Sequence, residues 1–289
     1  MKTGLVLSGG GSKGAFQVGA LDYLMRRENV VFDFVSGVST GSLQGAMVAQ
    51  NQLTNLAKIW FNLKKNTDIY NTGYIRLLWG GYPYSFNGME TLLKKYLKKT
   101  YDIPFMVGIV SLETGKYYSF KNPNIEMVLA SCSIPILFPP RYIDILRENC
   151  VDGGIRNITP LKEAIDFGCD TIYVITCYNE EEEFPIMKQK WGFLDSLKRT
   201  IDILVDEVKQ NDIITQDIRQ ANHINGVIND PSIIGFTSPN GTPYREIKII
   251  RIQPWIKDMV GVDSLYFGQD QIQTLYQKGM DAAEEIGFR

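Results

Sequence analysis

The N-terminal part of the chain has an apolar run, a glycine-rich turn and a helical pattern in direct succession, and this order constrains the fold more than any other feature. Residues 2–8 (KTGLVLS) have the composition of a buried strand, and residues 15–26 place apolar side chains at helical spacing. Residues 30–36 (VVFDFVS) again have strand character. The segment therefore predicts a βαβ unit, whose strands lie parallel in one sheet.

The rest of the chain continues the alternation of strands and helices. Two apolar-rich runs joined by a glycine-containing turn predict a hairpin over residues 104–120. Further strands are predicted over residues 170–176 and 245–252. Further helices are predicted over residues 40–50, with another from there through Trp60, over 89–99 with a lysine-rich outer face, and over 193–220. We expect an α/β fold of three layers, with a mainly parallel central sheet, helices on both faces and an added antiparallel hairpin.

Length and charge exclude several classes of protein. The 289 residues can bury a substantial core, and we expect one domain over residues 1–289. A net charge of −2 provides no overall basic field for binding nucleic acid. No window approaches the about 20 apolar residues of a membrane span, so we expect a soluble, cytoplasmic protein.

The four cysteines lie in apolar surroundings and show no CxxC spacing, which argues against both a zinc site and a disulfide framework. We expect buried, unreactive thiols at Cys132, Cys150, Cys169 and Cys177.

The glycine turn GGGSKG (residues 9–14) allows two ligands. It satisfies the GxGxxG pattern that holds a dinucleotide pyrophosphate, and its amides would equally hold the negative oxygen of an acyl-transfer intermediate. Asp33 lies near the expected position of a ribose-binding acid, but such an acid should end the second strand, and here FVS and another glycine turn follow. A Walker motif is excluded because Ala15 occupies the position of its lysine.

The second turn, GVSTG (residues 37–41), has the pattern of a nucleophile elbow. Gly37 and Gly41 remove side chains that would clash in a sharp strand-to-helix turn, and Ser39 is left exposed at the start of the helix. Adjacent parallel strands would place the two glycine-rich turns side by side at their carboxyl ends.

A serine nucleophile needs a base, and the chain contains a single histidine, His223. It follows a long predicted helix without a carboxylate motif to orient it, so a Ser-His triad is disfavoured. Asp152 follows an apolar run and precedes two glycines (CVDGG), so its carboxylate is a candidate base, although DG is also a common turn signal.

The order GGGSKG, GVSTG, DGG, with ASCSIPILFPP (residues 130–140) before the last, resembles the patatin-like phospholipases. The resemblance covers residues 2–161 and implies a patatin-like fold with a Ser-Asp dyad of Ser39 and Asp152. It further implies an oxyanion hole at the glycine triplet and supporting roles for the other motif residues: Gly9, Gly10 and Gly11 for the hole, and Lys13, Gly14, Gly37, Gly41, Gly153 and Gly154 for support.

The resemblance implies a serine acyl hydrolase that cleaves ester bonds of lipids, phospholipids above all, through an acyl-enzyme and without metal or organic cofactor. The partner would be a lipid substrate, with contact to a membrane surface left open; nothing in the sequence indicates the oligomeric state. Two other readings stay open: a dinucleotide-binding oxidoreductase that uses the GGGSKG turn, and a non-catalytic lipid-binding protein.

The aromatic segment from Thr67 to Gly88 has no clear period. It is expected to form a surface loop or irregular cap, and the alternative is a mobile apolar flap over an acyl-chain pocket.

Overall fold

A computed structural model describes residues 1–179, 247–259 and 262–287, together with a few single positions between 192 and 208. Most of the predicted helix over residues 193–220, and His223, lie outside the described residues. The helices within the described part include none that is both long and apolar enough to cross a bilayer.

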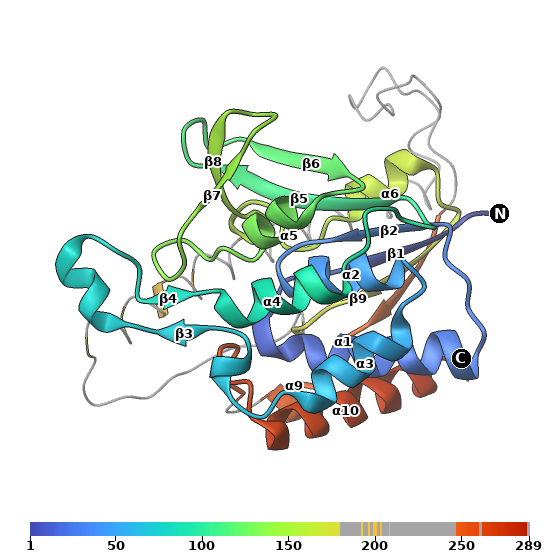
Figure 1. Cartoon of the computed structure of the whole chain (residues 1–289). Coiled ribbons are helices and arrows are strands. Elements are labelled where there is room, and N and C mark those ends of the chain that lie inside the picture. The colour runs from blue at the N-terminus through green and yellow to red at the C-terminus, as the bar shows by residue number, and fades with distance from the viewer. Residues whose placement is uncertain are drawn as a thin grey trace.

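An eight-stranded mixed sheet forms the centre of the fold, in the order β10-β9-β1-β2-β5-β8-β7, with β6 paired to β5 (Figure 1). The strands from β10 to β5 are parallel, and β6, β7 and β8 add antiparallel pairs. This confirms the predicted α/β class and the predicted hairpin. The strands are β1 (Thr3–Leu7), β2 (Phe34–Gly37), β5 (Phe105–Ser111), β6 (Tyr117–Lys121), β7 (Arg141–Ile143), β8 (Glu148–Asp152), β9 (Thr171–Ile175) and β10 (Lys248–Ile252).

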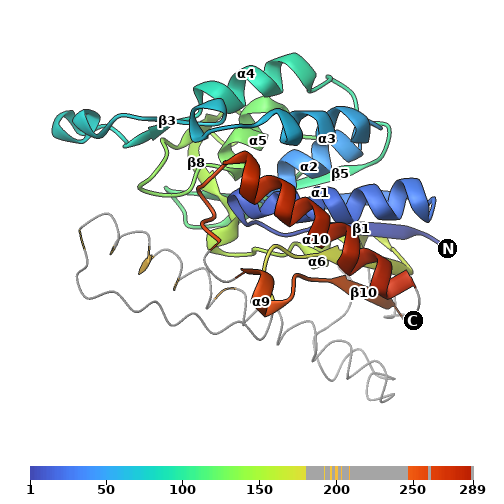
Figure 2. The same cartoon turned by 90° about the horizontal axis from the view of Figure 1, so that it is seen from below.

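Helices cover both faces of the sheet because the strand side chains alternate between two apolar clusters. Leu5 and Leu7 of β1 face the larger cluster, whereas Val6 faces a smaller one. Figure 2 shows α10 running beside α1, and Figure 1 shows α6 on the opposite side of the sheet. The larger cluster packs under α1 (Gly14–Asp22), α2 (Thr40–Val48), α3 (Leu53–Asn62) and α10 (Gln269–Gly287), and the smaller one under α6 (Leu161–Phe167).

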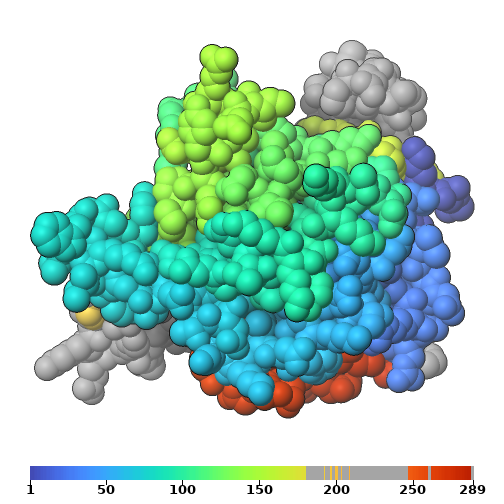
Figure 3. Space-filling view, viewed as in Figure 1, coloured from blue at the N-terminus to red at the C-terminus, as the bar shows by residue number. Residues whose placement is uncertain are grey.

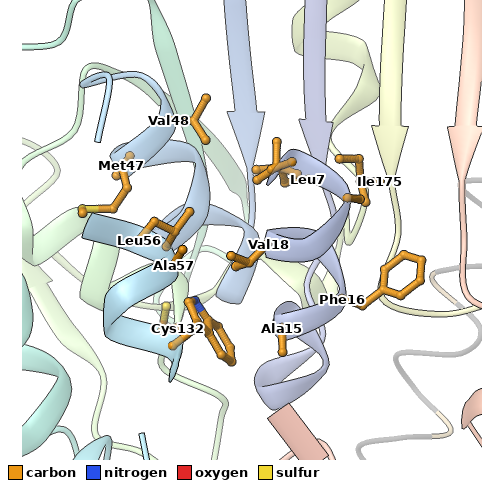
Figure 4. Close-up of a cluster of buried hydrophobic side chains, with 14 of the residues drawn as sticks. Leu7, Ala15, Phe16, Val18, Met47, Val48, Leu56, Ala57, Cys132 and Ile175 are labelled. Atoms are coloured by element: carbon orange, nitrogen blue, oxygen red, sulfur yellow. The ribbon is translucent and has the colours of Figure 1, made fainter. Parts of the chain in front are cut away.

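The part of the larger cluster beneath α1, α2 and α3 is fully apolar (Figure 4). Val18 of α1, Met47 of α2 and Leu56 of α3 belong to this cluster, together with Leu7 and Ile175 of the sheet. Helix α2 begins shortly after β2 ends, and α1 begins after the glycine turn and the 3-10 turn η1 (Gly11–Lys13) that follow β1.

The two helices predicted over residues 40–50 and from there through Trp60 are present as α2 and α3, and Asn51, which has a left-handed conformation with φ of 53°, lies between them. One boundary differs from the sequence prediction. Strand β2 begins at Phe34, four residues later than predicted.

Asp33 therefore precedes β2, and its carboxylate accepts a hydrogen bond from the Thr3 amide (2.7 Å) at the start of β1. It lies at the opposite end of β1 from the glycine turn, which removes the ribose-binding role that the dinucleotide reading requires.

The aromatic segment forms a small two-stranded hairpin, β3 (Asn71–Thr72) and β4 (Tyr84–Ser85), between η3 (Asn66–Asp68) and α4 (Asn87–Tyr96). The connection between the two strands contains a 3-10 helix, η4 (Tyr74–Trp79), and projects from the rest of the described chain (Figure 1). The base of the hairpin is buried through Ile69, Tyr70, Tyr84 and Phe86. The segment is thus neither an ordinary surface loop nor wholly a flap: its base is part of the core.

Candidate active site

Ser39 lies in the sharp turn between β2 and α2 and has a strained backbone, with φ of 55° and ψ of −128°. The flanking glycines make this turn sterically accessible. A Cβ atom on Gly41 would lie 2.3 Å from the Leu7 carbonyl oxygen, and one on Gly37 would lie 2.3 Å from the Gly41 carbonyl oxygen. This is the geometry expected of a nucleophile elbow.

The glycine turn between β1 and α1 lies directly beside this elbow, because Leu7 of β1 pairs with Gly37 of β2 in parallel register. The amide of Gly9 donates to the Ile158 carbonyl oxygen (3.0 Å). The amides of Gly10 and Gly11, in contrast, have no acceptor among the residues that the structure describes. Two of the three predicted oxyanion-hole amides are therefore available to a ligand, and the third is occupied.

Asp152 ends β8, whose antiparallel pairing with β5 sets it opposite Ile109. Only 4% of its surface is exposed. Burial raises the pKa of this carboxyl from its usual value near 3.8 to about 7, while hydrogen bonds from the Ser39 side chain and the Gly154 amide oppose the shift. The structure thus brings together Ser39 and Asp152, two residues 113 positions apart that sequence motifs alone had selected.

A short segment at the end of α5 (Ile125–Ser131) holds the elbow and the carboxylate strand in place. The Ser131 hydroxyl accepts from the Ser39 amide (3.0 Å) and donates to the Gly108 carbonyl oxygen (2.8 Å). The Cys132 thiol donates to the Ser39 carbonyl oxygen (3.2 Å), and the Ser133 carbonyl oxygen accepts from the Asp152 amide (2.9 Å). Sequence reasoning gave these residues no individual role; their signal was the ASCSIP motif.

Two pockets meet at Ser39. The first encloses about 830 Å³ of space between protein atoms, open solvent at its mouth included, and its wall is almost entirely apolar. The wall is built by α2, α3, α4 and the hairpin base and includes Leu43, Met47, Leu56, Trp60, Leu93 and Phe138. The second, of about 570 Å³ measured in the same way, contains Asp152, Gly154 and the glycine triplet beside Ile155 and Ile158. An apolar chain and a polar group can therefore both reach Ser39, from different sides.

A C-terminal segment, residues 262–268, completes the site from a distant part of the sequence. The Ser264 carbonyl oxygen accepts from the Ser12 amide (2.7 Å), and the Leu265 carbonyl oxygen accepts from the Tyr70 hydroxyl (2.7 Å). Leu265 lines both pockets. Nothing in the sequence marked these residues, because no local pattern connects them with the glycine turn.

The remaining motif residues support the turns. Gly14 lies where α1 approaches α2, and its carbonyl oxygen accepts from the Gln44 side chain (3.2 Å). Gly153 and Gly154 follow Asp152 in a 3-10 turn. Lys13 is half-buried beside the glycine triplet and does not line either pocket.

No group of three or more histidine, cysteine or acidic side chains able to hold a metal occurs among the described residues. All four cysteines are buried, as predicted, and burial raises the pKa of Cys132, which touches the elbow, and that of Cys150. Buried neutral thiols are poor nucleophiles, so Cys132 does not compete with Ser39 as the candidate nucleophile.

Comparisons with known proteins agree with this site. The model of a family described as Patatin-like phospholipase matches residues 5–165, a range that contains all three motifs. Lysophospholipase NTE1 of Scheffersomyces stipitis is 27% identical over 202 residues, covering 63% of this chain and 12% of that protein. NTE1 of Lodderomyces elongisporus is 26% identical over 202 residues, with 63% and 13% covered. The chain thus spans about an eighth of the length of these relatives.

Two further similarities are weaker. The uncharacterized protein YjjU of Escherichia coli is 24% identical over 237 residues, covering 75% of this chain and 63% of that protein. Among solved structures, VipD from Legionella pneumophila superposes with a TM-score of 0.46 and 12% identity, over 99% of this chain and 66% of that one.

Proposed function

We propose that this chain, which belongs to the patatin-like phospholipase family, cleaves acyl esters of lipids with Ser39 as nucleophile and Asp152 as base. Membership of the family supports a lipid hydrolase. The observation that carries the residue assignment is that Ser39, Asp152 and the glycine triplet line one pocket, with the Ser39 side chain close enough to Asp152 to lower the pKa of its carboxyl.

In the proposed mechanism, the Asp152 carboxylate takes the proton of the Ser39 hydroxyl as its oxygen attacks the ester carbonyl carbon. The carbonyl oxygen becomes an oxyanion, which the amides of Gly10 and Gly11 stabilise; one such donor is typically worth about 3 kcal/mol. The N-terminus of α2 adds a favourable dipole at the same place.

Collapse of the intermediate breaks the ester bond, and the leaving alcohol receives the proton from Asp152. A water molecule then gives a proton to Asp152 and attacks the acyl-enzyme. The fatty acid leaves, and the proton returns to Ser39. The dyad needs neither a histidine nor a metal for this cycle.

The pockets suggest how a lipid would be oriented. One acyl chain would occupy the apolar pocket of α2, α3 and α4, and the alcohol portion would lie on the side of Asp152 and the glycine triplet. A glycerophospholipid or lysophospholipid fits this division, and the NTE1 relatives are named lysophospholipases.

The test is intact-mass analysis after treatment with a fluorophosphonate, with wild type, Ser39→Ala and Asp152→Asn compared and the labelled peptide mapped. We expect one adduct on Ser39 in the wild type, none in Ser39→Ala and slow labelling of Asp152→Asn. Hydrolysis of phosphatidylcholine and lysophosphatidylcholine is then measured with the same proteins. A folded wild type that forms no adduct and releases no fatty acid would leave a non-catalytic lipid-binding protein as the better reading.

A further inference from the structure

The projecting connection between β3 and β4 exposes five large apolar side chains within six consecutive residues. We call this group the apolar tip: Tyr74, Ile75, Leu77, Leu78 and Trp79. The side chains of Leu78 and Trp79 are 81% and 85% exposed. Elsewhere in the described chain the exposed large apolar residues occur singly, as Val31 and Ile145 do, or as the adjacent pair Trp255 and Ile256. A cluster of this kind is typical of an interaction site.

The sequence around the apolar tip is strongly basic, although the chain as a whole is slightly acidic. Residues 53–99 contain eight lysine and arginine residues against two acidic residues, in a chain with a net charge of −2. All eight cations are exposed, and we call them the basic flank: Lys58, Lys64, Lys65, Arg76, Lys94, Lys95, Lys98 and Lys99.

The two acidic side chains of this region offset little of the charge of the basic flank. Asp68 accepts hydrogen bonds from the backbone amides of Lys64 and Lys65, and Glu90 forms ion pairs with one cation of the flank, Lys94, and with Arg141. Figure 3 shows the projecting segment continuing into the surface that α3 and α4 build, and the basic flank belongs to these elements and their ends.

The apolar tip is joined firmly to the acyl-chain pocket. Ile69 and Phe86, which flank the hairpin, line that pocket. The Gly73 amide bonds to the Pro83 carbonyl oxygen (2.8 Å), and the Tyr84 amide bonds to the Leu137 carbonyl oxygen (3.1 Å). The Phe86 and Phe138 rings stack at 4.0 Å between centroids. A membrane or protein that binds the tip would therefore lie close to the wall of the acyl-chain pocket.

We propose that the apolar tip inserts into a bilayer that contains anionic lipid, with the basic flank against the headgroups. Tryptophan and tyrosine favour the bilayer interface, leucine and isoleucine enter the acyl region, and cations bind anionic headgroups. The complementary charge of the flank favours this occupant over an apolar partner protein. A role of this membrane contact in delivering substrate rests on the proposed lipid hydrolysis. The binding of the tip to the bilayer does not depend on hydrolysis.

The experiment measures co-sedimentation of the full chain with sucrose-loaded vesicles of phosphatidylcholine, with and without phosphatidylglycerol. The tip variant is Leu78→Ser/Trp79→Ser, and its matched control is Val31→Ser/Ile145→Ser, which removes two equally exposed apolar side chains elsewhere. A flank variant, Lys95→Gln/Lys99→Gln, tests the charge. Hydrolysis of a soluble short-chain ester and urea unfolding are recorded for each protein.

We expect the wild type and the control to bind anionic vesicles. The tip variant should bind at least about tenfold more weakly, since burial of one such side chain alone is worth about tenfold in affinity. The flank variant should lose about fivefold for each charge at low salt, and neutral vesicles should bind all proteins weakly. Soluble-ester hydrolysis and stability should be the same in all four proteins.

Equal vesicle binding by the tip variant and the wild type would overturn the proposal, as would equal loss in the tip variant and the control. Lower stability of the tip variant would do so too, because the tip would then pack on another part of this chain. If the wild type is a dimer and only the tip variant is a monomer, the tip contacts a second copy of the chain and not a bilayer, and the proposal is overturned. If vesicle binding depends on the tip but the chain hydrolyses no ester, the proposed function is refuted and the membrane contact is supported.

Discussion

Replacing Asp152 with asparagine should abolish hydrolysis and yet stabilise the fold above neutral pH. The buried carboxyl has a pKa of about 7 in the folded chain against an ordinary value of 3.8. Each pH unit of difference corresponds to about 1.4 kcal/mol, so the ionised carboxylate costs the folded state on the order of 4 kcal/mol at most. Asparagine carries no charge and keeps an oxygen for the bond that Gly154 donates (2.8 Å).

The pH dependence follows from the direction of the shift. Below about pH 4 the carboxyl is protonated in both states and costs nothing. As the pH rises to about 7, the unfolded chain loses its proton while the folded chain keeps it, so the stability of the wild type falls relative to the variant. Above the folded pKa the difference is constant.

The assay is urea unfolding of the wild type and Asp152→Asn from about pH 4 to about pH 8. Asp144→Asn, which changes an exposed carboxylate on the β7–β8 turn, is the control and should have nearly wild-type stability. A variant that is no more stable than the wild type at the alkaline end would refute the reasoning, because Asp152 would then not be a desolvated carboxylate.

The remaining predictions concern turnover and packing. Wild-type kcat/KM for a soluble ester should fall about tenfold for each pH unit below the Asp152 pKa of about 7, since a protonated carboxyl cannot act as base; a flat profile between pH 5 and 7 would contradict this role. Ser131→Ala should lower kcat and cost about 1–3 kcal/mol in urea unfolding, because the Ser39 amide loses its buried acceptor. Leu93→Trp should raise KM for long-chain esters while short-chain esters are hydrolysed as before, and equal effects on both would argue against the acyl-chain pocket. Gly41→Ala should destabilise the fold by about 3 kcal/mol in the same unfolding assay, because its Cβ would meet a backbone oxygen.

The sequence allowed the βαβ core to be predicted because its information is local. Strand β1, helix α1 and the β5–β6 hairpin each follow from apolar spacing within a few residues, and the parallel register of β1 with β2 then places the two glycine turns together. The same logic placed the start of β2 at residue 30 and not at Phe34, since the boundary of β2 depends on pairing with β1 and not on composition.

The parts of the site that could not be predicted depend on contacts between distant segments. Strand β8 (ENCVD) is mostly polar and is stabilised by its antiparallel pairing with β5, about 40 residues earlier. Ser264 reaches Ser12 across some 250 residues. Residue spacing along the chain does not predict such contacts. Only the presence of ASCSIP and DGG in one set of motifs indicated that these segments lie together.

The burial of Asp152 links the chemistry of the site to its architecture. A carboxylate with an ordinary pKa would be a weak base for a serine hydroxyl, and the burial of Asp152 raises the pKa of its carboxyl to about 7. The hydrogen bonds from Ser39 and Gly154 then limit the shift, so that a useful fraction of the carboxylate is ionised near neutral pH. Because the Ser131–Ser133 segment bonds to both the elbow and the Asp152 amide, it connects Ser39 and Asp152, the proposed nucleophile and base. The proposed dyad would thus orient its base through the backbone, which is the task that a third residue performs in a triad.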